Sequence, residues 1–398
     1  MKISRKIKNI KPSPTIAISS LAGEMKRKGI NVINFSAGQP DFPTPENIKE
    51  AGIQAIRNNY TKYTPVPGIP EIKEAICRKF KRENDLEYNP DQVIVSSGAK
   101  QSIYLALQVL LEEGDEAVII SPYWVSYPPQ VELTGAKPVI INTTIEDDFK
   151  TTAGEIEKYI TDKTQLLILN SPNNPTGSLF SKNELEEIAD LCVRKNIFIV
   201  TDEIYEQLTY DNQKAVSIAS LNDNIKQITL TVNGASKSYS MTGWRLGYAA
   251  GPKELIGGMS KLQSQLDTHA VSISQYATIE ALDNGAESAR KMRESFDERR
   301  KYVVKRLNEI DGIKTNVPKG AFYIFPQVSA YYGKKYNDTI INDSVSFCKY
   351  MLEEMKIALV PGSAFGDDQC IRFSYAVSME DIKNGIDRLE EGLKKLEG

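Results

Sequence analysis

The chain has 398 residues, which is long enough for two domains and a large core. Hydrophobic residues make up 41% and charged residues 25%, as in ordinary globular proteins, and the net charge of −3 provides no basic surface for nucleic acid. A single histidine argues against a histidine-ligated zinc site and against a Ser-His-Asp triad. We therefore expect no metal, and a chemistry carried by lysine, tyrosine and carboxylates.

The N-terminus, the apolar runs and the cysteines favour a cytoplasmic protein. The basic opening MKISRKIKNIKPS is not followed by an apolar core, so we do not expect a secretory signal. No apolar run approaches the length that a membrane span needs. The four cysteines are scattered without CxxC pairs, which indicates reduced thiols.

Residues 1–45 have too few apolar positions for a domain, and we expect them to pack against the C-terminal part of the chain. From about Asn89, short apolar runs alternate with helical patterns. The runs EAVIIS, TQLLILNS and NIFIVTDE are typical of strands buried on both faces, and AKQSIYLALQVLL and SKNELEEIADLCVRK are typical of helices. This alternation predicts an α/β fold in which residues 46–290 form a large domain around a mainly parallel, doubly wound sheet.

The charged stretch 286–309 predicts a long helix that leads to a second unit, residues 291–398. In that unit AFYIF, IALVPG and CIRFSYA are typical of strands, and the C-terminal end is typical of a helix. We expect a smaller α/β domain that is formed by the N- and C-terminal parts together.

Polar or small residues follow successive strands of the predicted sheet. They are Gly98–Lys100, Pro122–Trp124, Ser171–Pro175, Asp202–Tyr205 and Gly234–Lys237. Ligands of open α/β sheets bind beyond the carboxyl ends of the strands. We therefore expect these clusters to converge on one site.

The chemistry of this edge suits a planar ligand that carries a phosphate. Gly98 precedes a helix whose first N–H groups can bind an anion, and Arg245 adds a positive charge. The small residues beside Lys237 let the backbone approach a planar molecule. Neither G-x-G-x-x-G after the first strand nor G-x-x-x-x-G-K-[ST] occurs, so NAD and P-loop nucleotides are not favoured. Taken singly, Lys237 could be a loop lysine, Asp202 a turn cap and Tyr205 a core residue.

Six short stretches follow one another along the chain in this order: KYTPVPG, SPYWVSYP, SPNNPTG, TDEIY, SKSYSMTGWRLG and CIRFSYA. Together they resemble the class I aminotransferases, which use pyridoxal phosphate (PLP), and most closely the bacterial and archaeal branch of aspartate aminotransferases. The resemblance runs from about Lys11 to the C-terminus. It implies the fold of PLP-dependent transferases.

The resemblance also implies roles around the PLP ring. Lys237 would bind PLP covalently and carry the proton during transfer. Asp202 would hold the pyridine nitrogen protonated, and Tyr205 and Asn174 would hydrogen-bond the ring oxygen. Trp124 would stack on the ring.

For the phosphate, the resemblance implies Arg245 and the N–H groups of Ala99 and Lys100. Tyr63 would reach the phosphate of the neighbouring subunit, so the active unit would be a homodimer with shared sites. The position three before the lysine is often a serine that contacts the phosphate. Here it is Gly234, and whether Ser236 replaces that contact stays open.

For the substrate, the resemblance implies that Arg372 binds the α-carboxylate, beside Gly38, Asn174 and Trp124. Lys100 would contact a second carboxylate, and Ser13 and Thr15 would close over it. Aspartate and glutamate are therefore the expected donors, with oxaloacetate and 2-oxoglutarate as acceptors.

Other readings remain open at this point. Lys100 could serve only the phosphate loop, and the substrate could be prephenate or an aromatic or neutral amino acid. A PLP lyase on the same fold is a further alternative. His269, the one histidine, is expected to be packed or interfacial rather than catalytic.

Overall fold

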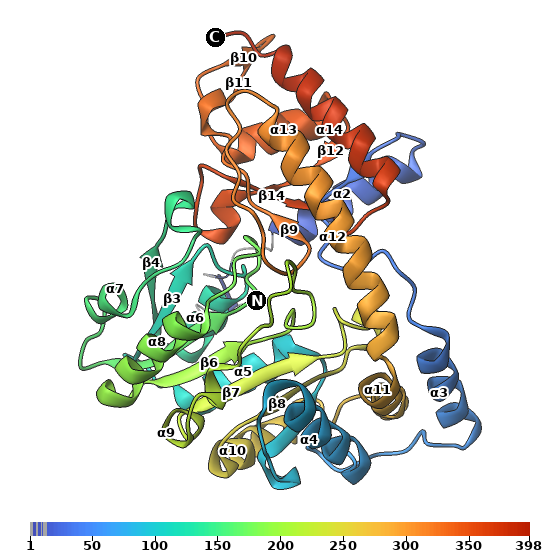
Figure 1. The fold of residues 1–398 in the computed structure, drawn as a ribbon, viewed down its shortest axis with the longest axis vertical. Coiled ribbons are helices and arrows are strands. Elements are labelled where there is room, and N and C mark those ends of the chain that lie inside the picture. The colour runs from blue at the N-terminus through green and yellow to red at the C-terminus, as the bar shows by residue number, and fades with distance from the viewer. Residues whose placement is uncertain (1–2, 5–6, 9, 11–13) are drawn as a thin grey trace.

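The computed structural model describes residues 3–4, 7–8, 10 and 14–398. Figure 1 shows a large sheet with its helices in the lower part of the view and a smaller group of elements above it. Helix α12 (Ala286–Asn308) runs alongside both. Among the described helices, none is both long and apolar enough to cross a membrane.

Within the described residues the large sheet has seven strands in the order β2-β8-β7-β6-β5-β3-β4. The strands are β2 (Val93–Ser96), β8 (Gly247–Ala250), β7 (Thr229–Gly234), β6 (Phe198–Asp202), β5 (Thr164–Asn170), β3 (Glu116–Ser121) and β4 (Lys137–Asn142). Strand β8 is antiparallel to both β2 and β7, and the other pairings are parallel. The expectation of a mainly parallel sheet is therefore confirmed. Because β2 and β7 both run antiparallel to β8, they are parallel to each other. The carboxyl ends of the six strands other than β8 therefore lie at the same edge of the sheet.

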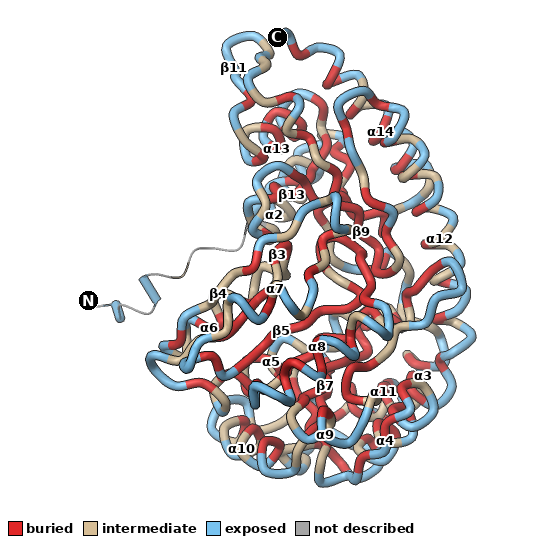
Figure 2. The backbone as a smooth tube through the Cα atoms, turned by 60° about the vertical axis from the view of Figure 1, so that its left-hand side comes forward, coloured by how far each residue is buried: buried red, intermediate tan, exposed pale blue. Residues whose placement is uncertain are grey.

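Helices cover both faces of this sheet. One face packs against α5 (Ala99–Leu110), α6 (Tyr127–Thr134) and α10 (Lys253–Gln263). The other face packs against α3 (Glu46–Arg57), α4 (Pro70–Asn84), α7 (Ala153–Glu157), α8 (Lys182–Lys195), α9 (Asp223–Lys226) and α11 (Ser272–Asn284). Figure 2 shows the resulting burial of the strands. Because the centre of a strand such as β5 is buried on both faces, its central run LLIL is apolar at every position.

Local sequence signals set the ends of the helices. Helix α8 begins at Ser181, whose side chain accepts from the N–H of Glu184 at 3.3 Å, while the Glu184 carboxylate accepts from the N–H of Ser181 at 2.7 Å. The helix ends at Asn196, which has a φ of 53°. The helix predicted over SKNELEEIADLCVRK is therefore confirmed.

We call the upper group of elements the small unit. It contains α2 (Pro14–Arg27), β1 (Ile33–Asn34), β9 (Tyr323–Ile324), β10 (Lys335–Tyr336), β11 (Thr339–Ile340), α13 (Ser344–Glu353), β12 (Ile357–Ala358), β13 (Val360–Pro361), β14 (Ile371–Ser374) and α14 (Met379–Lys394). Strand β1 pairs with β12, and β14 pairs with both β13 and β9. Segments from both ends of the chain therefore meet in this unit, while the domain boundaries at 45/46 and 290/291 stay a prediction.

Aromatic packing joins the two ends of the chain. Phe35 follows β1 and stacks on Phe373 of β14 at 4.0 Å between ring centroids. Gly385 of α14 also lies against Phe35, and an ideal Cβ there would be 2.2 Å from the Phe35 ring. Both rings are fully buried, so neither can move aside easily.

We expect Gly385→Ala to lower the melting temperature, because the added methyl overlaps Phe35 and overpacking of this kind costs about 1–3 kcal/mol. Gly257 of α10 provides a matched control, since no described atom lies within 4 Å of a Cβ added there. Gly257→Ala should be neutral or stabilising by up to about 1 kcal/mol, because alanine favours the helix. Thermal unfolding of the two variants checks the prediction, and equal melting temperatures would contradict it.

Candidate active site

A cavity of about 500 Å³ lies where the carboxyl edge of the large sheet faces the small unit. Its wall contains most of the site residues expected from the sequence. They are Thr15, Gly38, Ala99, Lys100, Trp124, Asn174, Asp202, Tyr205, Lys237, Arg245 and Arg372. The strand-end clusters therefore do converge on one place.

Lys237 lies just beyond β7, and its Nζ donates to the carbonyl oxygen of Gly38 at 2.6 Å. Burial lowers the pKa of Lys237 to about 8, and the nearby positive charge of Arg372 contributes, while Asp202 opposes the change. At neutral pH most of the amine is still protonated, but a far larger fraction is neutral than in an exposed lysine. Such an amine can act as a nucleophile or as a base.

Asp202 ends β6 and is buried. Its Oδ2 accepts from the hydroxyl of Tyr127 at 2.7 Å, and its Oδ1 accepts from the N–H of Ile204 at 3.3 Å. Burial raises the pKa of Asp202 to about 6, and these hydrogen bonds oppose that rise. Tyr127 was not among the expected site residues, although it belongs to the SPYWVSYP stretch.

Tyr205 contacts Tyr323, which, like Tyr127, was not among the expected site residues. The hydroxyl groups of Tyr205 and Tyr323 lie 2.9 Å apart and share a hydrogen bond. Tyr323 belongs to β9, in the run AFYIF that was interpreted only as a strand. Burial raises the pKa of both hydroxyl groups, so both stay protonated.

Arg372 of β14 is 3% exposed and closes the cavity from the small unit. Its Nη1 donates to Asn174 Oδ1 at 3.2 Å and its Nη2 to the carbonyl oxygen of Ser36 at 2.7 Å. Its Nε is buried without a hydrogen-bond partner among the described residues. The guanidinium also lies over the Tyr323 ring at 4.5 Å. A buried cation of this kind suits an anionic ligand.

The opposite end of the cavity suits a phosphate. Ala99 and Lys100 belong to the first turn of α5, whose N–H groups have no acceptor within the helix. Arg245 approaches this turn closely, because a Cβ on Gly98 would be 2.6 Å from its Nη2. Gly247 is equally constrained, since its Cβ would lie 2.1 Å from the nitrogen of Ala99.

The packing explains Gly234. A Cβ there would lie 3.0 Å from Ile204 and 3.1 Å from both Gly247 and Leu246, so a serine would need its neighbours to shift. Ser236, in contrast, lines the cavity. Ser236 is therefore the hydroxyl of this segment that can reach a ligand.

The side chain of Lys100 also points into the cavity. Its Nζ lies 4.8 Å from the centre of the Trp124 ring. Burial, and then repulsion from Arg245, lower the pKa of Lys100. Within the described residues, no carboxylate forms an ion pair with this ammonium group, which lies in the cavity wall.

One expected residue lies away from the cavity. Tyr63 is 90% exposed and does not belong to the described cavity wall; its ring packs edge-on against His269 at 5.7 Å. His269 itself is half-buried, and its Nδ1 lies 2.8 Å from the carbonyl oxygen of Ala270. Ser13 lies outside the described residues. In the part of the chain that is described, no three His, Cys, Asp or Glu side chains group as metal ligands would.

Known proteins are similar to this chain in sequence and in fold. The family model for aminotransferases of class I and II matches residues 30–389. An aspartate aminotransferase of Bacillus sp. (strain YM-2) is 45% identical, with 98% of this chain and 99% of that protein covered. A probable aspartate/prephenate aminotransferase of Aquifex aeolicus is 43% identical, with 99% of each chain covered.

Among solved structures, the aspartate aminotransferase from Rhizobium meliloti superposes with a TM-score of 0.96 at 41% identity, and all of both chains is covered. The agreement therefore extends over the whole fold. The chain belongs to the class I and II aminotransferase family.

Proposed function

We propose that this protein is a PLP-dependent aminotransferase that moves the amino group of aspartate or glutamate to a 2-oxo acid. The observation that carries the proposal is the grouping of Lys237, Asp202 and Arg372 in one cavity. They supply an amine of lowered pKa, a buried carboxylate and a buried guanidinium. The relatives that are named aspartate aminotransferases support this choice of reaction.

PLP fits the donor set of the cavity. Its phosphate suits the N–H groups of Ala99 and Lys100 together with Arg245, and its flat ring suits the face of Trp124. The tight contacts that Gly98 makes with Arg245 support a phosphate position at this helix end. When bound, PLP supplies an electron-withdrawing ring that stabilises negative charge on the α-carbon of the substrate.

The chain's own residues would then divide the work. Lys237 would hold the cofactor covalently and, once released, its Nζ would take the proton from the α-carbon of the substrate. Asp202 is mostly ionised at neutral pH, because its pKa is about 6, and its carboxylate would keep the ring nitrogen protonated. Tyr127 would hold that carboxylate in place. Tyr205 and Asn174 would donate hydrogen bonds to the ring oxygen.

The substrate's α-carboxylate would bind to Arg372, whose planar guanidinium suits a carboxylate. The Nε–H of Arg372 is a buried donor without a partner among the described residues. The main chain at Gly38, together with Asn174 and Trp124, would complete that end of the site. All amino acids carry this group, so these residues do not select among them.

Selection of a second carboxylate would depend on Lys100. Its ammonium group lies in the cavity wall, and Thr15 of α2 lines the same cavity. We also assign Ser13 to this end of the site on the resemblance alone. Prephenate is the second candidate acceptor, since a relative carries that name. Aromatic or neutral donors and a PLP lyase are the remaining alternatives.

We further propose a cytoplasmic homodimer with shared sites. Tyr63 supports this proposal because its ring is exposed beside His269, away from the cavity of its own chain. An exposed tyrosine held in this way is suited to contact a second copy.

The first test is the reaction itself. Purified protein with PLP, aspartate and 2-oxoglutarate should form oxaloacetate and glutamate, because only a transaminase exchanges these groups. Lys237→Ala is the control, and it should lose about 10²–10⁴-fold in rate with the proton carrier. Products of β-elimination or decarboxylation, or a preference for phenylalanine or alanine over aspartate, would overturn the assignment.

The second test concerns Lys100. Lys100→Ala should lower kcat/KM for aspartate and glutamate by roughly ten- to a hundredfold, because a hydrogen bond to a charged group is worth about 1.5–3 kcal/mol. The rate with phenylalanine should be unchanged, since alanine keeps the N–H of the phosphate site. If both donor classes slow equally, Lys100 serves PLP or the fold instead.

The third test concerns sharing between subunits. Tyr63→Phe should weaken PLP binding about tenfold or more, through loss of a hydrogen bond to the phosphate. Mixed dimers with Lys237→Ala should regain activity, because one of their two sites then has both wild-type residues. A mixture no more active than its separate parents, or a fully active monomer, would contradict shared sites.

A further inference from the structure

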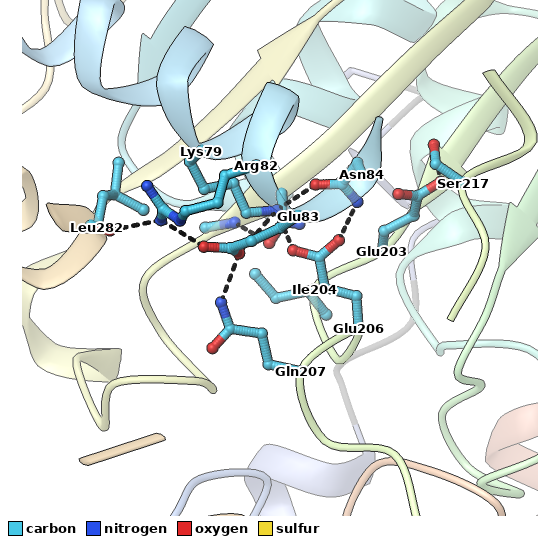
Figure 3. Close-up of polar contacts among 12 residues, drawn as sticks. Lys79, Arg82, Glu83, Asn84, Glu203, Ile204, Glu206, Gln207, Ser217 and Leu282 are labelled. Carbon is cyan, nitrogen blue, oxygen red and sulfur yellow. Dashed lines mark hydrogen bonds and ion pairs between the residues drawn. The ribbon is translucent and has the colours of Figure 1, made fainter. Parts of the chain in front are cut away.

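A group of polar side chains, with a buried ion pair at its centre, lies beneath the turn that carries Tyr205. We call it the Lys79 cluster: Lys79, Glu83 and Asn84 of α4, with Glu206 and Gln207 of the turn (Figure 3). Two backbone hydrogen bonds close this turn. The N–H of Glu206 donates to the carbonyl oxygen of Glu203 at 3.0 Å, and the N–H of Leu208 donates to the carbonyl oxygen of Tyr205 at 2.8 Å. Tyr205 lines the cavity, whereas Glu206 and Gln207 contact α4.

The ion pair in this cluster has a fixed orientation. The side chain of Lys79 is 1% exposed and that of Glu206 is 7% exposed. Lys79 Nζ donates to Asn84 Oδ1 at 2.7 Å and to one oxygen of Glu206, and Asn84 Nδ2 donates to the other oxygen of Glu206. Both carboxylate oxygens are therefore held from one turn of α4.

Glu206, and not its neighbour Glu203, is the carboxylate that pairs with Lys79. Burial, and then the charge of Glu206, raise the pKa of neighbouring Glu203 to about 8, so Glu203 is mostly protonated at neutral pH. Its carboxyl group is instead hydrogen-bonded to Ser217 at 2.8 Å and to Thr201 at 3.2 Å. Lys79 is thus left to pair with Glu206, with Glu83 farther away at 3.7 Å.

Gln207 links α4 to the segment that carries Lys237. Gln207 Nε2 donates to Glu83 Oε2 at 2.8 Å and to the hydroxyl of Tyr239 at 3.1 Å. Tyr239 is buried and lies two residues beyond Lys237. The cluster therefore contacts both segments that bring functional side chains into the cavity from β6 and β7.

Stability alone does not explain a buried ion pair, because desolvation of both charges offsets their attraction and apolar side chains of similar volume do as well. We propose that the Lys79 cluster positions Tyr205, holding its turn from below so that the Tyr205 hydroxyl stays in place to donate to the PLP ring oxygen. Lys79 and Glu206 are positioning residues in this arrangement. The inference rests on the proposed function, since it requires PLP in the cavity.

The test uses the PLP-loaded enzyme and reads the pH midpoint of its visible absorption band. A hydrogen bond from Tyr205 would stabilise the ring oxygen of bound PLP as an anion. A proton on the Lys237 nitrogen would stabilise the same oxygen by a hydrogen bond of its own, so it would compensate for a weaker bond from Tyr205. Weaker donation by Tyr205 therefore lets the nitrogen keep its proton to a higher pH. Tyr205→Phe sets the upper limit, a rise of about 1–2 pH units for loss of a hydrogen bond to a charged group.

Lys79→Met leaves Glu206 buried and unpaired and can fail to fold, so the double variant Lys79→Met/Glu206→Leu carries the test. Its melting temperature should fall less than that of Lys79→Met, because it leaves the amide of Asn84, but no buried charge, without a partner. Its midpoint should still rise by about half a unit or more. In a Tyr205→Phe background the same double change should add no further shift, because residues that act through one another are not additive. Arg78→Met/Asp283→Asn removes an ion pair of the same helix that faces α11, and its midpoint should equal that of the wild type.

Each other outcome overturns the proposal. A double variant with the wild-type midpoint assigns the cluster to the fold alone. A shift that persists in the Tyr205→Phe background, or one that the Arg78 control also produces, shows a route other than Tyr205. A wild-type protein that binds no PLP overturns both this inference and the proposed function, whereas a wild type with a titrating band leaves the proposed function standing whatever the variants do.

Discussion

Desolvated positive charge is the constraint on which the site depends. Lys237 and Arg372 lie in one cavity, and no carboxylate of the described part of the chain forms an ion pair with Arg372. Burial of such charges costs free energy unless a ligand of opposite charge pairs with them. Hydrogen bonds to backbone carbonyls, at Gly38 and Ser36, hold both cations without neutralising them. The cavity is thereby prepared for molecules that bring carboxylate and phosphate groups.

The two parts of the fold contribute different halves of this arrangement. Parallel strands of the large sheet deliver Asp202 and Lys237 at their carboxyl ends, as the general rule for open α/β sheets requires. The small unit delivers Arg372 and Tyr323 from one antiparallel sheet. The Phe35–Phe373 stack fixes the N-terminal segment against that sheet, so that Gly38 reaches Lys237.

Much of this was predictable, and the misses have physical reasons. The buried strands and their polar ends were evident because each is a continuous local pattern. Strand β8 was not predicted, because GYAA is short and poor in β-branched residues. Tyr127 and Tyr323 were missed since their partners, Asp202 and Tyr205, are distant in sequence. Lys79 lies in a charged helical stretch where lysine is ordinarily solvent-exposed.

The pairing of β14 has a consequence for how the protein can vary. Arg372 and Phe373 are adjacent, and side chains of a strand alternate between its faces. A slip of one residue against β9 or β13 would keep the backbone hydrogen bonds but turn a phenyl ring toward the cavity and the guanidinium toward the aromatic core. Insertions or deletions between Ile324 and Ile371 therefore have to preserve strand alignment, even where the intervening loops tolerate changes in length.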